Sequence, residues 1–133
     1  ELDEDAILNE LLYIKDRINK SSAILTDKKK TAFFFVVTAD GMIINDTVKA
    51  AQLFAKFDVP LSGYVVNRVL PEELKTQNIP EYLKNRFAMQ EQYLKVIEET
   101  FKDQIHAYVP EMERDVTGLP MIEKLAKTMF DEF

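Results

Sequence analysis

The sequence predicts an α/β fold in which a parallel sheet carries helices on both faces. Three short apolar segments, at residues 33–37, 63–67 and 105–109, have the composition of strands, and a helix-length segment separates each from the next. Strands that alternate with helices of this length form parallel βαβ units with right-handed crossovers. The 133 residues suffice for one domain, and no repeat or linker divides them.

The first half of the chain contains signals for two helices and one strand. Between residues 5 and 20, apolar side chains recur at spacings of three and four, which predicts an amphipathic helix. The continuous apolar run at residues 33–37 is typical of a strand that is buried on both faces. Gly41 interrupts this pattern, Asn45 can cap a second helix, and that helix is expected to end before Pro60.

The second half of the chain continues the alternation. Pro80 suits the first turn of a helix, and Pro110 ends a strand because proline cannot donate a ladder hydrogen bond. The expected elements are, in order, a strand over residues 63–67, a long polar loop over 70–80, a helix from Pro80 to about residue 102, a strand over 105–109 and a helix over 119–130.

Composition and charge exclude several classes of protein. The absence of cysteine excludes a disulfide scaffold, a thiolate nucleophile and a thiolate zinc site, and the single His106 leaves no histidine cluster for a metal. Seventeen basic against 23 acidic side chains give a net charge of −6, which argues against a surface that binds nucleic acid. His106 lies inside an apolar strand and is interpreted as a hydrogen-bonded structural side chain rather than a general base.

The chain has no signal for membrane insertion or export. Its longest apolar run, residues 32–37, is far too short to span a bilayer, and no signal-peptide pattern precedes it. We therefore expect no transmembrane segment and a cytoplasmic location. The chain starts at Glu1 rather than Met, in a dense acidic stretch, and this start predicts a fragment of a longer protein.

Ligands of an open parallel sheet bind outside the carboxyl ends of its strands. Those ends are expected at residues 38–42, 67–70 and 110–117. Neither a GxxxxGKS/T nor a GxGxxG motif is present, so these 133 residues contain no loop that cradles a triphosphate. Asp46 and Glu81 open the second and third predicted helices, and a carboxylate there occupies the positive dipole end that an anion would use.

Asn67 is the strongest candidate for a side chain that binds a nucleotide base. Adenine is held by amide groups, backbone and apolar packing rather than by cations. An Asn at a strand end offers both a donor and an acceptor to a purine edge. The alternative is that Asn67 is a turn former whose side chain bonds nearby backbone. Asp40, after the first strand, is interpreted as a solvated loop acid rather than a phosphoacceptor.

Five short strings occur in a characteristic order between residue 25 and the C-terminus. They are LTDKKKT before FFFVVT (residues 25–38), TADGM with DT (38–42 and 46–47), VVNRVLP (65–71), RFAMQEQYL (86–94), and VP with DVTGL (109–110 and 115–119). Each string alone is a weak signal. In this order and spacing, they resemble the arsenite-pump ATPase family of anion-transporting ATPases.

The resemblance implies a deviant-Walker P-loop NTPase fold, of which residues 1–133 would be the C-terminal segment of a single ATPase domain. In that family the phosphate loop and the switch regions lie upstream of the matched segment, so this chain would lack them. The family's C-terminal segment contacts adenine through the strand-end Asn and a proline-containing loop. We therefore expect no catalytic or metal-binding residue here, and adenine-binding roles for Asn67, Arg68, Pro110, Glu111 and Met112.

The implied function is that of an ATPase that couples ATP binding and hydrolysis to the extrusion of arsenite or another anion, or to a related transport or targeting cycle. The intact protein would bind ATP and Mg²⁺, whereas this chain alone would hold neither and would be inactive. The implied partner is a membrane pump subunit or a client protein, and not nucleic acid. The alternative hypothesis is a stand-alone α/β interaction or regulatory domain that does not hydrolyse nucleotide.

The sequence also departs from the family it resembles. The branch that targets tail-anchored proteins carries a CxxC zinc site that bridges a dimer, where this sequence has Pro80 and Leu83. A homodimer of this protein would therefore not be bridged by zinc. Asp115 stands where the family usually has Glu, and Thr117 stands where it often has Arg.

Overall fold

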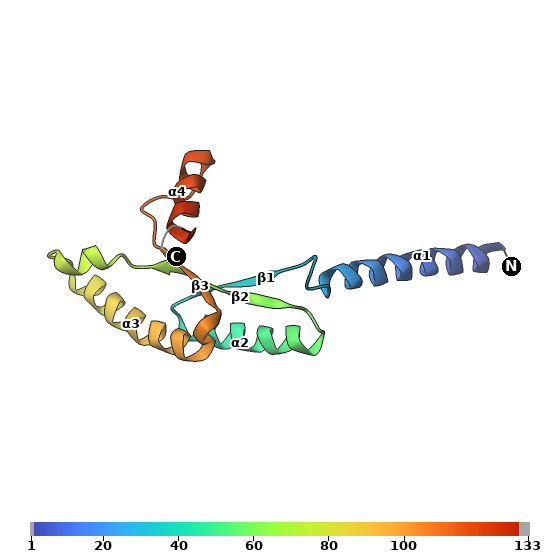
Figure 1. Ribbon diagram of the computed structural model, residues 1–133, viewed down its shortest axis with the longest axis horizontal. Helices are drawn as coiled ribbons and strands as arrows, with labels where there is room; N and C mark the ends of the chain where they lie inside the picture. The colour runs from blue at the N-terminus through green and yellow to red at the C-terminus, as the bar shows by residue number, and fades with distance from the viewer. Residues whose placement is uncertain (1, 131–133) are drawn as a thin grey trace.

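The computed structural model of the chain describes residues 2–130, and Glu1 at the acidic start lies outside the described residues. Figure 1 shows a three-stranded sheet with α2 and α3 on one face and α4 on the other, while α1 extends away from the sheet. The predicted α/β fold with helices on both faces is thus confirmed. The elements are α1 (Leu2–Leu25), β1 (Phe33–Thr38), α2 (Gly41–Lys56), β2 (Leu61–Val69), the short 3-10 helix η1 (Glu72–Thr76), α3 (Glu81–Phe101), η2 (Lys102–Gln104), β3 (Ile105–Pro110) and α4 (Gly118–Phe130).

All three strands run parallel in the order β1-β2-β3, with β2 in the centre. Thr38 at the end of β1 is the register partner of Asn67, and Val69 at the end of β2 is the partner of Pro110. The carboxyl ends of the strands therefore lie together at one edge of the sheet, where ligands of such sheets bind.

The buried core lies between the sheet and the α2–α3 side. Val37, Val66 and Ile97 have no exposed surface, and they belong to one apolar cluster with Ile44 of α2. Tyr64 of β2 stacks on Phe101 at the end of α3, with ring centroids 4.0 Å apart. Because this cluster contains side chains of the strands, α2 and α3, its burial fixes both helices relative to the sheet. The core also fixes the position of the strand ends.

The start of α2 differs from the sequence-based prediction. Asp40, and not Asn45, is the N-cap: its Oδ1 accepts hydrogen bonds from the backbone N–H of Met42 at 2.9 Å and of Ile43 at 3.3 Å. The helix therefore begins at Gly41, and Asp46 lies inside it rather than at its opening. Asp40 and Asn45 are both cap-forming residue types. Only two residues separate the end of β1 from the start of the helix, and this places Asp40 at the cap.

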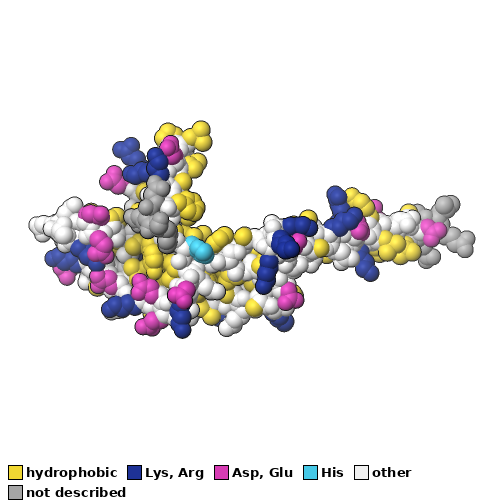
Figure 2. Space-filling model, viewed as in Figure 1, with side chains coloured by type: hydrophobic (Ala, Val, Ile, Leu, Met, Phe, Trp, Pro, Cys, Tyr) yellow, Lys and Arg dark blue, Asp and Glu magenta, His cyan; other side chains and the backbone are white. Residues whose placement is uncertain are grey.

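The prediction that β1 is buried on both faces is wrong for the described residues. Val37 is buried against α2 and α3, but Phe34 is 48% and Val36 61% exposed on the opposite face. In Figure 2, hydrophobic side chains form a visible area on the sheet beside α4. Among the described helices, α4 covers part of that face. It packs on β3, so Phe34 and Val36 of β1 stay exposed.

The first helix is longer than predicted, and it extends away from the sheet in Figure 1. The amphipathic pattern is confirmed as a helix, yet its apolar side chains are exposed: Ile7, Leu11 and Ile18 each keep more than half of their surface accessible. Within residues 2–130, no helix is both long and apolar enough to cross a membrane.

The remaining boundaries shift by a few residues. β2 is longer than predicted, and the polar loop before Pro80 contains η1. Pro80 precedes α3 as its N-cap residue instead of lying in its first turn. Pro110 is the last residue of β3, and the adjacent Glu111 N–H bonds to the Val69 carbonyl at 2.7 Å. The strand pairing thus continues just past the proline.

A close approach at Gly63 generates a stability prediction. His106 lies against Gly63, with Nε2 3.0 Å from the Ser62 carbonyl oxygen, which confirms its interpretation as a hydrogen-bonded structural side chain. A Cβ at position 63 would overlap the His106 ring and lie 2.6 Å from the Gln104 carbonyl oxygen. Gly63→Ala should therefore lower the free energy of unfolding by about 2 kcal/mol or more, measured by urea denaturation.

Gly118→Ala is the matched control. Gly118 has a φ of +75°, but a Cβ there would meet only Pro120 Cδ at 3.8 Å. Its cost should be limited to backbone strain of about 1 kcal/mol. A smaller loss of stability for Gly63→Ala than for Gly118→Ala would contradict the proposed overlap.

Candidate functional site

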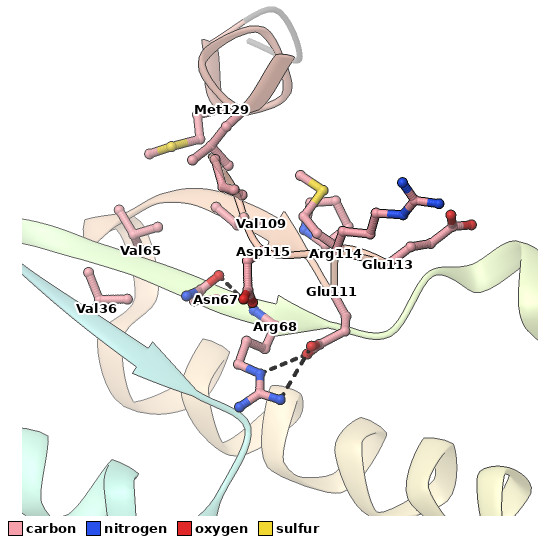
Figure 3. A pocket seen from close by; sticks show the side chains of 14 residues that line it. Val36, Val65, Asn67, Arg68, Val109, Glu111, Glu113, Arg114, Asp115 and Met129 are labelled. Atoms are coloured by element: carbon pink, nitrogen blue, oxygen red, sulfur yellow. Dashed lines mark hydrogen bonds and ion pairs between the residues drawn. The ribbon is translucent and has the colours of Figure 1, made fainter. Parts of the chain in front are cut away.

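The site lies at the carboxyl edge of the sheet, in a hollow of about 610 Å³ under α4 (Figure 3). Its lining comes from β1, β2, β3, the loop after β3, and α4. A hollow of this size is in the range of small-molecule sites. All five residues that the sequence predicts for adenine binding line it: Asn67, Arg68, Pro110, Glu111 and Met112.

The walls of the hollow are apolar. Val36, Val65 and Val109 come from one face of the three strands, and Leu125 and Met129 come from α4. Valine and methionine side chains on two sides make a slot that suits a flat ring, because stacking a ring there removes apolar surface from water. The polar groups of the site are confined to the strand end and the loop.

Asn67 lies in β2, close to its carboxyl end, half-buried in the hollow. Its Oδ1 accepts a hydrogen bond from the Arg68 backbone N–H at 2.9 Å. This is the local bond that the turn-former alternative expects, and Arg68 adopts a left-handed conformation with φ 60°. The same bond fixes the orientation of the amide. Among the described residues the Nδ2 group donates to no protein acceptor, so it is free for a ligand.

Arg68 and Glu111 form an ion pair across the strand ends. Arg68 Nε donates to Glu111 Oε2 at 2.8 Å, and Nη2 donates to Oε1 at 3.3 Å. These hydrogen bonds, together with the carboxylate charge, raise the pKa of the Arg68 guanidinium above its ordinary value. The bidentate geometry ties the loop after β3 to the end of β2. Both charged groups are thus engaged with each other.

Pro110 and Met112 take different places in the site. Pro110 ends β3 beside Val69, so its ring forms part of the edge of the hollow. Met112 follows in the loop and is half-buried there. An unbranched thioether adapts to the shape of a neighbouring group, which suits a flexible contact with a ligand.

A second, smaller hollow of about 290 Å³ lies on the α3 side of the same edge. Arg68 and Glu111 line both hollows, so their ion pair separates the two. On this side, Gln90 of α3 is buried and its Oε1 accepts a hydrogen bond from the Leu70 N–H at 2.9 Å. The helix is thereby attached to the backbone that follows β2.

The helix N-termini at this edge carry acids, though not always those predicted. Asp40 occupies the N-terminus of α2, whereas Asp46 is bound to Lys49 within the helix at 3.8 Å. Glu81 does open α3, as predicted. Neither terminus is therefore free for a phosphate group. The part of the chain described here also contains no group of three or more His, Asp or Glu side chains that could hold a metal ion.

Sequence reasoning missed several residues of the hollow. Val36 and Val65 were expected only as strand residues, and Leu125 and Met129 only as part of a helix; no local pattern states that α4 folds over the sheet. Asp115 lies in a loop that the strand order does place at this edge, but nothing in the sequence indicates that its side chain lines the hollow.

The fold and the hollow together define a class of protein. A parallel sheet with helices on both faces, and a ligand-sized hollow at the carboxyl ends of its strands, define an α/β domain whose candidate ligand site lies at the strand ends. The sequence profile of the anion-transporting ATPase family matches residues 1–131. The chain belongs to this family.

Individual relatives carry the names of two kinds of ATPase. A protein of Aquifex aeolicus provisionally named arsenical pump-driving ATPase 1 is 29% identical over 117 residues, which are 88% of this chain and 30% of that protein. ATPase GET3 of Candida glabrata is 25% identical over 96% of this chain and 36% of its own length. ATPase GET3A of Arabidopsis thaliana is 26% identical over 92% and 34%. The chain thus spans about a third of the length of these relatives.

The Arg68–Glu111 pair generates a prediction on the mobility of the loop after β3. The pair is exposed, so Arg68→Ala should leave the global free energy of unfolding nearly unchanged. The loop should nevertheless open more often, because Glu111 is then held to β2 only by the hydrogen bond from its N–H to the Val69 carbonyl oxygen. Hydrogen exchange followed by mass spectrometry should show several-fold faster exchange in residues 111–116.

Lys49→Ala serves as the control for this measurement, since it removes an exposed ion pair within α2. It should leave exchange in residues 111–116 unchanged. Equal exchange in the wild type and in Arg68→Ala would mean that the ion pair does not restrain the loop.

Proposed function

We propose that this chain is the C-terminal, adenine-binding portion of an ATPase that couples ATP binding and hydrolysis to the extrusion of arsenite or another anion, or to a related transport or targeting cycle. The observation that carries the proposal is the meeting of Asn67 and the Pro110–Met112 loop in one hollow with apolar walls. These groups come from separate strands and supply what a purine ring requires: apolar faces and an amide at the edge.

The size and polarity of the hollow support an adenine ring rather than a phosphate. Its walls on the strands and α4 are valine, leucine and methionine side chains. Of its two lining cations, Arg68 is already bound to Glu111, and Arg114 of the loop extends away from the strands in Figure 3. A triphosphate needs cations, backbone donors or a metal ion. We therefore assign the base to this hollow, with Asn67, Arg68, Pro110, Glu111 and Met112 as the residues around it.

The phosphate groups and Mg²⁺ are assigned to another part of the intact protein. The 133 residues contain no glycine-rich phosphate loop, and Asp40 occupies the N-terminus of α2. Residues 1–133 would then be the C-terminal segment of a single P-loop ATPase domain. A phosphate loop outside this sequence would complete its ATP-binding site. When bound, ATP supplies the free energy for the conformational cycle.

The partners follow from the names of the relatives. One relative is named a driver of an arsenical pump, and others are named GET3. We propose a membrane pump subunit or a client protein as the partner, in the cytoplasm, without nucleic acid. A homodimer would lack the zinc bridge of the targeting branch, because Pro80 and Leu83 stand where that branch has its CxxC cysteines.

Because the phosphate groups and Mg²⁺ are assigned to another part of the protein, we predict that these 133 residues alone do not hydrolyse ATP. Phosphoryl transfer needs a Lys-bearing phosphate loop, Mg²⁺ and a positioned water. Purified residues 1–133 should release phosphate at the rate of the buffer control, measured with a coupled phosphate assay. Hydrolysis by residues 1–133 that a substitution within them abolishes would contradict the proposal.

Asn67→Ala tests the adenine contact. In the intact gene product, this change should weaken ATP binding about tenfold, because the amide donor to the base is lost, with little change in the melting temperature. Isothermal titration calorimetry measures the affinity. Asn85→Ala, at an exposed position of α3, is the matched control and should bind ATP as the wild type does.

Two results would count against the adenine contact. Unchanged ATP affinity in Asn67→Ala would reduce Asn67 to the turn former that its bond to the Arg68 N–H also allows. Absence of ATP binding in the wild-type gene product would favour the second candidate, an α/β interaction or regulatory domain. The observation behind that candidate is the exposed apolar side of α1, which includes Ile7, Leu11 and Ile18.

A further inference from the structure

Three carboxylates line the main hollow, and only one of them is both free and directed into it. Glu111 is bound by Arg68. In Figure 3, Glu113 and the neighbouring Arg114 extend away from the strands, whereas the Asp115 side chain descends from the loop toward the end of β2 that carries Asn67. Within residues 2–130, Asp115 has no ion pair, so its oxygens are available as acceptors.

Asn67 presents the opposite hydrogen-bonding group. Its Oδ1 already accepts from the Arg68 N–H, so the Nδ2 group is left as the donor for a ligand. The polar corner of the hollow therefore offers one donor, from Asn67, and one acceptor, from Asp115. The walls on the strands and α4, made by residues such as Val65 and Met129, are apolar and do not select one purine over another.

Adenine has the complementary pattern on one edge. Its ring nitrogen N7 accepts a hydrogen bond, and the adjacent 6-amino group donates one. Purines with a 6-oxo group, such as hypoxanthine and guanine, place a second acceptor where adenine has the donor. A carboxylate opposite a carbonyl oxygen has no proton to share, so that pairing leaves two acceptors unsatisfied.

We propose that Asp115 determines the base specificity of this site: it accepts the 6-amino group of adenine while Asn67 donates to the neighbouring ring nitrogen. The inference rests on the proposed function, because it requires that a nucleotide base occupies the hollow. It adds the selection of 6-amino over 6-oxo purines. From the sequence, Asp115 is only a position where the family usually has Glu, and no role follows for its side chain.

The test compares ATP with inosine triphosphate, which carries a 6-oxo group and the same phosphate charge. Because the charge is equal, the ratio of the two dissociation constants reports the base contact and not the electrostatics of the loop. The intact gene product is titrated with each nucleotide by calorimetry. We expect the wild type to bind ATP at least about tenfold more tightly.

Asp115→Asn replaces an acceptor-only group by one that also donates, so the preference for ATP should fall about tenfold. Asp115→Ser provides a second variant with a hydroxyl that donates and accepts, for use if the first does not fold. Asp103→Asn makes the same chemical change in η2, at the opposite end of β3, and should keep the wild-type ratio.

A test on the ligand side needs no variant. Purine riboside triphosphate lacks the 6-amino group and should bind to the wild type about tenfold more weakly than ATP. Equal binding of these two nucleotides, an unchanged ratio in Asp115→Asn, or a wild-type preference for inosine triphosphate would each overturn the role of Asp115 and leave the proposed function standing. A wild-type protein that binds none of the nucleotides would overturn the proposed function itself.

Discussion

β2 hydrogen-bonds in parallel to β1 on one side and to β3 on the other, and this pairing determines where everything else lies. Parallel strands must return by long crossovers, which α2 and α3 provide, and these helices bury one face of the sheet. The pairing also brings three carboxyl ends to one edge. The β2–β3 pairing is what places Asn67 next to the loop after Pro110.

The edge is held by short, specific contacts rather than by a large core. The Arg68–Glu111 pair and the Glu111 N–H bond to Val69 fasten the loop, and Gln90 fastens α3 to the backbone after β2. An exposed ion pair contributes little to stability, but a bidentate one fixes orientation. These contacts hold the strand side of the hollow, and the loop after β3 and α4 form its other side.

The two faces of the sheet are unequal, and this asymmetry underlies both the core and the site. On the α2–α3 face, Val37, Val66 and Ile97 are fully buried. On the other face, Phe34 and Val36 stay exposed, and α4 packs mainly on β3. A sheet face that is partly covered leaves room for a ligand between strand and helix, and the main hollow occupies that room.

The sequence by itself determined the strands, the helices and the parallel direction of the strands, because apolar runs, helical spacing and their alternation can be read along the chain. It also placed Asn67 and Pro110 at the same edge, since parallel strands share a direction. Only the tertiary structure decided that Asp40 caps α2, that one face of β1 stays exposed, and that Leu125 and Asp115 reach the hollow. Those features depend on which surfaces meet in space, and contacts between residues far apart in the chain leave no local pattern.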